Sequence, residues 1–383
     1  MTTQAVEATP VGVGVPFPIV SRPQKRYGNL QSVNNLAAGG SFQVIQLSAT
    51  GWVRRVSLFF TQTITFASGG AVVAGDGPFN LITAITLTDA TGQPVVQPIS
   101  GFNAMLVNKW LPGGQPGGVP VPYDNPQMSK EYAFSSTGVL GTAVWRIDLD
   151  FEQDAKTAYG CIPNLDSNAS LQLRVDYAAY TNAFTGVTPS AAALSMRVSQ
   201  EYWAPVSSSI GNVAAEASPA GAGDYLETRY ETQTVSASSE NLVNLTNRGG
   251  FVKGLLLVSR AAGVRTAVTA GSNLGILLDN QPINEGIPFE EHMDQYTRKF
   301  GYFGAEITTS YAPLSAGTNA GSERGVVPIN FDCLSDGRDS WLNTRAGSLF
   351  QVKITPGAAA TTLEVVTQLM QVKHPDAFFN AGR

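Results

Sequence analysis

Four acidic residues at alternating positions are the side chains best placed to do chemistry: Asp148, Asp150, Glu152 and Asp154. Alternate side chains of a strand point to the same face, so these carboxylates would lie together. Such a row could bind calcium or supply the paired carboxylates of a glycoside hydrolase. The residues between them, over 145–151, alternate as apolar side chains, as on a strand with one buried face. We therefore expect the acids to face solvent.

Histidine occurs only at His292 and His374, which leaves little for acid–base or nucleophilic catalysis. Glu290 and Asp294 flank His292 and would share a helical face, where they could contribute to a metal site. A charged helix face explains the same residues without a ligand, and we favour it. His374 follows the last expected strand and is expected to be an exposed tail residue.

Other chemical motifs are weak or missing. Asp332, Asp336 and Asp339 match a cation-binding loop only loosely. Cys161 and Cys333 form no C-x-x-C pair, which argues against a thiolate zinc site or a disulfide framework. The sequence has no nucleophile elbow and no phosphate-binding loop followed by lysine. We therefore expect no catalytic residue, no cofactor and no metal ligand.

Length and composition favour two β domains. The chain has 383 residues, of which 43% are hydrophobic and only 14% charged, so it can bury large cores beneath an uncharged polar surface. Its net charge of −5 is spread without a basic block, so we expect no specific nucleic-acid binding. No stretch approaches the roughly 20 apolar residues of a membrane span.

Strand patterns dominate the chain. Apolar and polar residues alternate over 171–177 and 194–198, and longer strands are indicated over 52–66 and 363–372. Helical spacing is confined to short stretches, the clearest of which come at matching places in the two halves.

The first helix is expected over Ser100–Trp110, with Ser100 as its N-cap. The second is expected to begin at Pro288, with Glu290 and Glu291 in its first turn and an apolar stripe that runs from Phe289 to Phe300. We expect each helix to lie against the side of a β-sandwich.

The two halves repeat one another in order and spacing. Residues 42–47 are matched by 241–245, and Gly51–Leu58 by Gly250–Leu257, 199 positions later. Further matches join 87–94 to 277–282, 146–151 to 328–332, and 170–175 to 348–354. About eight strands per half, with one helix midway, predict two tandem eight-stranded jelly-roll β-sandwiches, each with a short flanking helix.

Low-complexity segments suggest the domain limits. We expect an N-terminal arm at 1–28, a first jelly roll at 29–205, a linker at 206–226, a second jelly roll at 227–374 and a C-terminal tail at 375–383. The arm could grip a neighbouring molecule or be a frayed terminus, and both interpretations stay open. The Gly- and Pro-rich segment 111–127 is expected to be an exposed interaction loop.

The chain resembles the double jelly-roll major capsid proteins of tailless, internal-membrane bacteriophages and related viruses. The likeness lies in Gly77–Ile82, Ile85–Gly92, Ile99–Phe102 and Leu106–Asn108, and the tandem halves extend it over residues 27–372. The resemblance implies a structural protein without enzymatic activity, which forms pseudo-hexagonal homotrimeric capsomers of an icosahedral shell. It also implies neighbouring capsomers, penton and minor capsid proteins as partners, an internal membrane beneath the shell, and a place in the virion after assembly in the host cytoplasm.

Aromatic side chains are candidates for contacts between subunits: Trp110, Tyr123, Tyr132 and Trp341. Positions in the core explain them as well, and we favour that interpretation. Arg22, Lys25 and Arg26 could face lipid or DNA, but three charges are more simply a solvated surface. Two other functions remain open, namely a tandem jelly-roll glycan hydrolase and a carbohydrate-binding spike.

Overall fold

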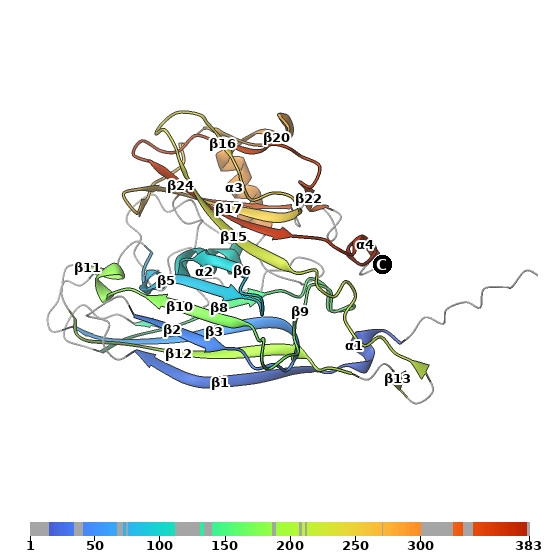
Figure 1. The fold of residues 1–383 in the computed structure, drawn as a ribbon. Helices are drawn as coiled ribbons and strands as arrows, with labels where there is room; N and C mark the ends of the chain where they lie inside the picture. Colours follow the sequence, from blue (N-terminus) through green and yellow to red (C-terminus); the bar gives the residue numbers. More distant parts are fainter. Residues whose placement is uncertain are drawn as a thin grey trace, which may run out of the picture.

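The computed structural model describes most of the chain and shows two β-rich lobes stacked one above the other (Figure 1). The described residues are 15–33, 41–66, 72–73, 76–111, 131–133, 140–185, 189–206, 209–210, 213–269, 271–299, 325–331 and 340–380. No helix within these ranges is long and apolar enough to cross a bilayer.

The first lobe is a sandwich of two antiparallel sheets. One sheet contains, in spatial order, β1 (Pro23–Val33), β12 (Pro189–Trp203), β3 (Gly51–Phe66) and β8 (Leu140–Asp150). The other contains β2 (Ser41–Gln46), β10 (Gln172–Tyr177), β5 (Ile82–Thr88) and β6 (Pro94–Ile99). Two short strands, β7 (Glu131–Ala133) and β9 (Ile162–Asn164), extend the first sheet.

The second lobe repeats this arrangement. Its first sheet contains β15 (Leu226–Thr234), β24 (Thr362–Met370), β17 (Phe251–Ala261) and β21 (Val326–Asn330). Its second sheet contains β16 (Asn241–Asn244), β23 (Phe350–Ile354), β19 (Asn273–Leu278) and β20 (Gln281–Pro288). When these eight main strands are numbered along the chain, both lobes have the spatial orders 1-8-3-6 and 2-7-4-5, which is the jelly-roll topology. The predicted fold class is confirmed.

Shorter elements precede, connect or follow the main strands. They are α1 (Phe17–Val20), β4 (Val72–Val73), η1 (Phe79–Leu81), η3 (Tyr180–Asn182), β11 (Phe184–Thr185), β13 (Ser209–Ile210), β14 (Val213–Ala214), β18 (Val264–Arg265), β22 (Leu342–Asn343) and α4 (Pro375–Asn380).

Two helices occupy matching places, between the fifth and sixth main strands of their lobes: α2 (Gly101–Trp110) and α3 (Phe289–Lys299). The expected cap of α2 is confirmed, because Asn103 N donates to Ser100 Oγ at 3.1 Å. The helix α3 begins one residue later than expected, since Pro288 ends β20.

The position of α2 differs from the expected one. All ten of its residues are buried, because the helix lies between the two lobes rather than on an outer side of one sandwich (Figure 1). Its polar residues Asn103 and Asn108 therefore find partners within the protein instead of water.

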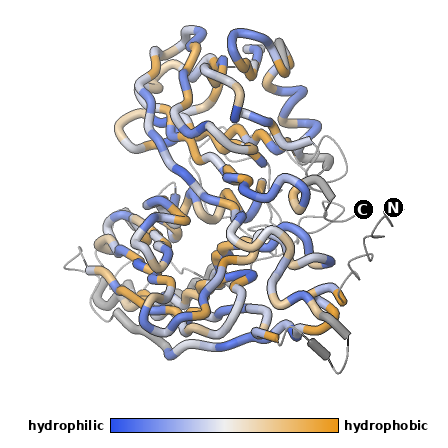
Figure 2. The backbone as a smooth tube through the Cα atoms, turned by 45° about the vertical axis from the view of Figure 1, so that its right-hand side comes forward, coloured by the Kyte–Doolittle hydropathy of each residue, from blue (hydrophilic) through white to orange (hydrophobic). Residues whose placement is uncertain are grey.

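The two lobes share one hydrophobic core. The largest buried cluster combines side chains of the first lobe and α2 with Leu256, Val258, Val326 and Val366 of the second lobe. A parallel bridge between Val96 of β6 and Thr228 of β15 also joins a sheet of each lobe. Figure 2 shows apolar and polar residues alternating along the strands of both lobes. The chain thus folds as one unit of two sandwiches.

Two of the expected domain limits need correction. Pro23–Tyr27 pairs with β12, so this segment is the start of edge strand β1 and not part of an arm. Proline is tolerated there because an edge strand has one unpaired side. The expected tail includes α4, whose Phe378 is buried against Phe251 with ring centroids 4.4 Å apart. Residues 1–14 and 112–127 lie outside the described residues.

Candidate functional site

The four alternating acids do not face solvent as expected. Asp148, Glu152 and Asp154 are each at least nine-tenths buried. Arg146 Nε lies 2.7 Å from Asp148 Oδ1, and Asp150 is ion-paired with Arg55 of the neighbouring strand β3. The prediction was wrong because this end of the sheet is covered, and arginines of β8 and of the neighbouring strand β3 pair with Asp148, Asp150 and Glu152.

Glu152 and Asp154 have structural partners too. Glu152 accepts hydrogen bonds from Arg54 Nε at 2.7 Å and from the indole Nε1 of Trp203 at 2.7 Å. Asp154 accepts from the main-chain N of Lys156 at 2.9 Å, which closes the turn after β8. A carboxylate held by two protein donors has little freedom to bind a cation or attack a substrate.

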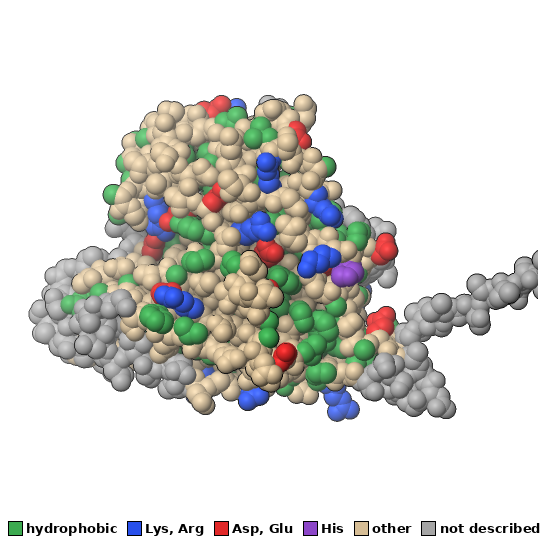
Figure 3. Space-filling model, viewed as in Figure 1, with side chains coloured by type: hydrophobic (Ala, Val, Ile, Leu, Met, Phe, Trp, Pro, Cys, Tyr) green, Lys and Arg blue, Asp and Glu red, His purple; other side chains and the backbone are tan. Residues whose placement is uncertain are grey.

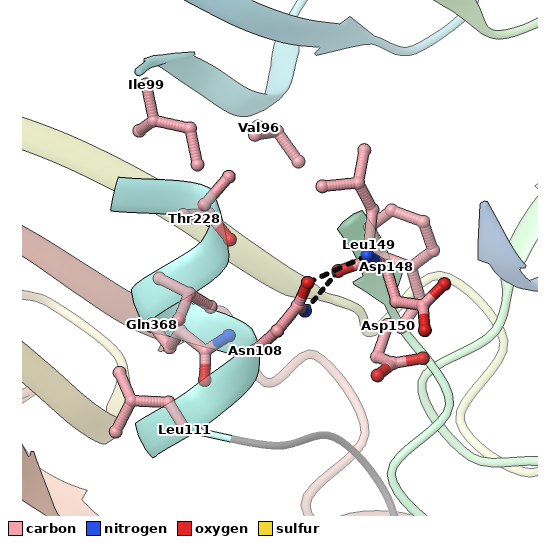
Figure 4. Close-up of a pocket in the computed structure, with 12 residues that line it drawn as sticks. Val96, Ile99, Asn108, Leu111, Asp148, Leu149, Asp150, Thr228 and Gln368 are labelled. Carbon is pink, nitrogen blue, oxygen red and sulfur yellow. Dashed lines mark hydrogen bonds between the residues drawn. The ribbon is translucent and has the colours of Figure 1, made fainter. Parts of the chain in front are cut away.

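A small cavity lies where β8, α2 and the second lobe meet (Figure 4). Its volume is about 20 Å³, and Asp148, Asp150 and Gln368 line it. Asn108 binds the main chain of Asp148 at both ends, since its Oδ1 accepts from Asp148 N at 2.8 Å and its Nδ2 donates to Asp148 O at 2.5 Å. Such a cavity has room for a water molecule but not for a sugar.

One carboxyl group that lines this cavity, that of Asp150, has a shifted pKa. Burial raises the pKa of Asp150 above its ordinary value; Arg55 opposes this shift and Asp148 adds to it. A raised pKa is what a catalytic acid needs. A hydrolase also needs carboxylates that can reach the substrate, whereas Asp150 is ion-paired with Arg55 and Asp148 with Arg146. The geometry therefore gives no support to glycan hydrolysis.

His292 is part of the packing of α3. It is almost fully buried, and its Nε2 lies 2.6 Å from the carbonyl oxygen of Pro328 on β21. Glu290 and Asp294 are exposed, whereas the ring of His292 points into the protein. No group of three metal-binding side chains is found in the part of the chain that the structure describes. Asp332, Asp336, Asp339 and Cys333 lie outside that part, and Cys161 is buried.

Burial of His292 predicts a pH dependence of stability. Burial lowers the pKa of His292, so below about pH 6.5 the unfolded chain takes up a proton that the folded chain does not. Stability should therefore fall as the pH decreases from 7 to 5. In His292→Gln, which keeps a hydrogen-bond donor but cannot titrate, the fall should be smaller by up to about 1.4 kcal/mol per pH unit.

Urea unfolding at pH 7, 6 and 5 measures the effect. His374→Gln is the matched control, because His374 has a half-exposed side chain beside Asp224. Equal pH dependence in the wild type and His292→Gln would show that His292 does not contribute.

The expected aromatic contacts between subunits are not on the surface. Trp110 and Trp341 are buried within the chain, which confirms the favoured core interpretation for both. Tyr123 lies outside the described residues, as does the side chain of Tyr132. Figure 3 shows charged side chains scattered over the visible face rather than gathered in one patch.

Other apolar side chains are exposed and were missed from the sequence. Tyr27 on β1 is 65% exposed, and Phe59 on β3 is 46% exposed. Val44 on β2 and Leu242 on β16 are 55% and 53% exposed. The alternation of apolar and polar residues identifies the strands but does not show that these four side chains point away from the cores. Only the fold shows this.

Val44 and Leu242 occupy equivalent places on the edge strands of the two lobes. Val44 pairs with Arg174, which is ion-paired with Asp176 at 2.7 Å. Leu242 pairs with Lys353, which is ion-paired with Glu240 at 3.0 Å. The sequence repeat, which aligns residues 42–47 with 241–245, is the signal that could have found this pair.

Comparisons with known proteins rest on structure alone. No protein-family model and no curated protein matches the sequence. The major capsid protein of Sulfolobus Turreted Icosahedral Virus superimposes with a TM-score of 0.61 at 11% identity, over 93% of this chain and 98% of that chain. The Faustovirus major capsid protein gives 0.53 at 8% identity, over 92% and 90% of the two chains.

The major capsid protein of bacteriophage PM2 gives a TM-score of 0.50 at 8% identity, over 90% of this chain and 98% of that chain. The match extends through both lobes, since nine-tenths of each chain is covered in all three cases. The chain therefore has the double jelly-roll fold that these viral major capsid proteins share.

Proposed function

We propose that this protein is the major capsid protein of an icosahedral virus and forms pseudo-hexagonal homotrimeric capsomers. One observation carries the proposal: the same jelly roll occurs twice in a single folded unit, with the same strand order in both copies. The similarity to viral major capsid proteins over nine-tenths of the chain supports it.

Two similar sandwiches per chain suit a hexagonal building block. Three chains supply six sandwiches, and a closed ring of three copies needs only one kind of contact between chains. The core shared by the two lobes fixes the angle between them, so each chain spans two sides of the hexagon as a rigid unit. Hexagonal units of this kind can tile a shell.

The surface and the buried acids agree with a structural role. Exposed Arg174 and half-buried Lys353 are each paired with an acid on the same lobe, which reduces repulsion between identical molecules packed side by side. The acids of β8 are bound by the protein's own donors. We propose that the protein is not an enzyme and binds no specific nucleic acid.

The finer assignments follow from the same proposal. The partners are neighbouring capsomers together with penton and minor capsid proteins, and a membrane lies beneath the shell. The protein is located in the virion after assembly in the host cytoplasm. The limits of the arm, linker and tail outside the corrected segments are part of this proposal.

The oligomeric state of the purified protein tests the proposal. Light scattering at micromolar concentration should give three times the 40.4 kDa chain mass, and negative-stain microscopy should show three-lobed particles with a hexagonal outline. A monodisperse monomer that never assembles would contradict it.

A further inference from the structure

The first sheets of the two lobes are equivalent residue by residue. Phe59 pairs with Arg197 as Val258 pairs with Glu364, and both β3 and β17 have a bulge two to four residues from their start. Likewise, Tyr27 pairs with Ser199 as Tyr230 pairs with Val366. Tyr27 and Phe59 of the first lobe therefore occupy the places of Tyr230 and Val258 in the second.

In the second lobe this sheet face is covered by the first lobe. Val258 is fully buried in the shared core, and Tyr230 packs against that core. The main-chain N of Tyr230 donates to Gln97 Oε1 at 2.8 Å, and Glu364 accepts from Asn103 of α2 at 3.2 Å. The fit is close, because a Cβ atom on Gly254 would lie 2.5 Å from Leu111.

In the first lobe the described part of the chain leaves the aromatic side chains of the equivalent face exposed. Tyr27 and Phe59 are exposed there, as are Lys25 and Arg197. Lys25 is ion-paired with Glu201 at 3.0 Å, and Arg197 is exposed beside Phe59. Figure 1 shows β1 and β12 on the side of the first lobe that faces away from the second lobe. We call this surface the Tyr27–Phe59 face.

The helix α3 has the place in the second lobe that α2 has in the first. Asn108 of α2 binds the main chain of Asp148, and His292 of α3 binds the main chain of Pro328. The two contacted residues are equivalent, because Asp148 pairs with Ser57 and Pro328 pairs with Leu256, 199 positions further along the chain.

Unlike α2, whose ten residues are all buried, the helix α3 exposes Glu290, Glu291 and Asp294. Among the described residues, the chain thus has a helix packed against a sheet face, an equivalent helix with an exposed acidic side, and an equivalent sheet face with exposed aromatic side chains.

We propose that the α3 side of one copy covers the Tyr27–Phe59 face of the next, repeating between chains the contact that α2 makes within the chain. The proposal rests on the capsomer function. Charge supports the match, because Arg197 stands where the second lobe has Glu364, and the exposed side of α3 carries Glu290, Glu291 and Asp294. A head-to-tail contact closes into a ring of three when successive copies are related by a rotation of one third of a turn.

A pair of double variants tests the apolar part. Tyr27→Ser/Phe59→Ser should weaken the trimer roughly 100-fold, because central aromatic side chains carry much of an interface's affinity. Phe42→Ser/Val44→Ser is the matched control on β2 and should leave the trimer intact. Sedimentation velocity over a concentration series measures association, and circular dichroism checks that the variant chains remain folded.

A charge exchange tests the direct contact. Arg197→Glu and Glu291→Arg should each weaken the trimer, and the two changes together should restore it to within a few-fold of the wild type. This result decides the matter if Tyr27→Ser/Phe59→Ser fails to fold.

The possible failures are distinguishable. A wild-type chain that does not form trimers overturns the capsomer function itself. Suppose instead that the wild type forms a trimer, that Tyr27→Ser/Phe59→Ser and Phe42→Ser/Val44→Ser leave it equally stable, and that the charge exchange gives no recovery. This result overturns only the assignment of this face.

Discussion

Trp110→Ala is expected to lower the free energy of unfolding by about 3–5 kcal/mol, and to do so for both lobes at once. Trp110 is fully buried at the end of α2, in the cluster that contains side chains of both lobes. Its carbonyl oxygen accepts from Asn330 Nδ2 of β21 at 3.2 Å, a bond that the substitution leaves in place. The loss of stability therefore comes from the lost packing of the indole ring and from the cavity that it leaves.

Urea unfolding followed by circular dichroism, and thermal unfolding followed by calorimetry, should each show one transition, with a midpoint lower than that of the wild type. Leu165→Ala is the matched control, since Leu165 is a half-exposed aliphatic side chain, and it should cost less than about 0.5 kcal/mol. Two separate transitions, or a loss in Trp110→Ala as small as in the control, would mean that the lobes do not share a working core.

The fold was predictable because its signals are local and occur twice. Alternation over a few residues marks the strands, and the matched segments follow one another in the same order in both halves. One match was inexact: the sequence aligned Arg146 with Pro328, whereas the strand registers align Asp148 with Pro328. A shift of two residues keeps every side chain on its face, so a period of two cannot detect it.

The burial of charged and polar residues was not predictable, because it depends on distant parts of the chain. The alternation along its strand predicts that Asp150 faces solvent. Its partner Arg55 lies 95 residues earlier, so the local pattern cannot indicate the ion pair. Asn108 is buried for the same reason, because the second lobe and β8 enclose α2. Whether the outward face of one sheet is the surface of the molecule is decided only when the two lobes meet.

The second large effect is expected at Asp76, which joins the lobes by charge. Arg260 Nη1 lies 2.6 Å from Asp76 Oδ2 and Arg265 Nε lies 2.5 Å from Asp76 Oδ1, with all three side chains largely buried. Burial alone would lower the pKa of Arg260, but the charges of Asp76 and Glu364 outweigh it and raise that pKa. Arg260 therefore stays charged, and both buried guanidinium groups bind the carboxylate of Asp76.

Asp76→Ala should lower the free energy of unfolding by about 3–5 kcal/mol, because it removes the carboxylate that two buried guanidinium groups share. Arg260 keeps Glu364 at 2.9 Å, whereas Arg265, which is stacked on Phe102, loses the carboxylate of Asp76. Asp76→Ala/Arg265→Met, which removes both charges and keeps an apolar side chain on Phe102, should therefore recover part of the loss.

Asp176→Asn, at the exposed ion pair with Arg174, is the control and should change stability little. Urea unfolding of the four proteins at pH 7 measures the differences. If Asp76→Ala behaves like the control, the arginines are hydrated and the charges do not hold the lobes together. If it is destabilised and Arg265→Met restores stability, the buried charges fix the angle between the two sandwiches, and with it the geometry on which closure of a ring depends.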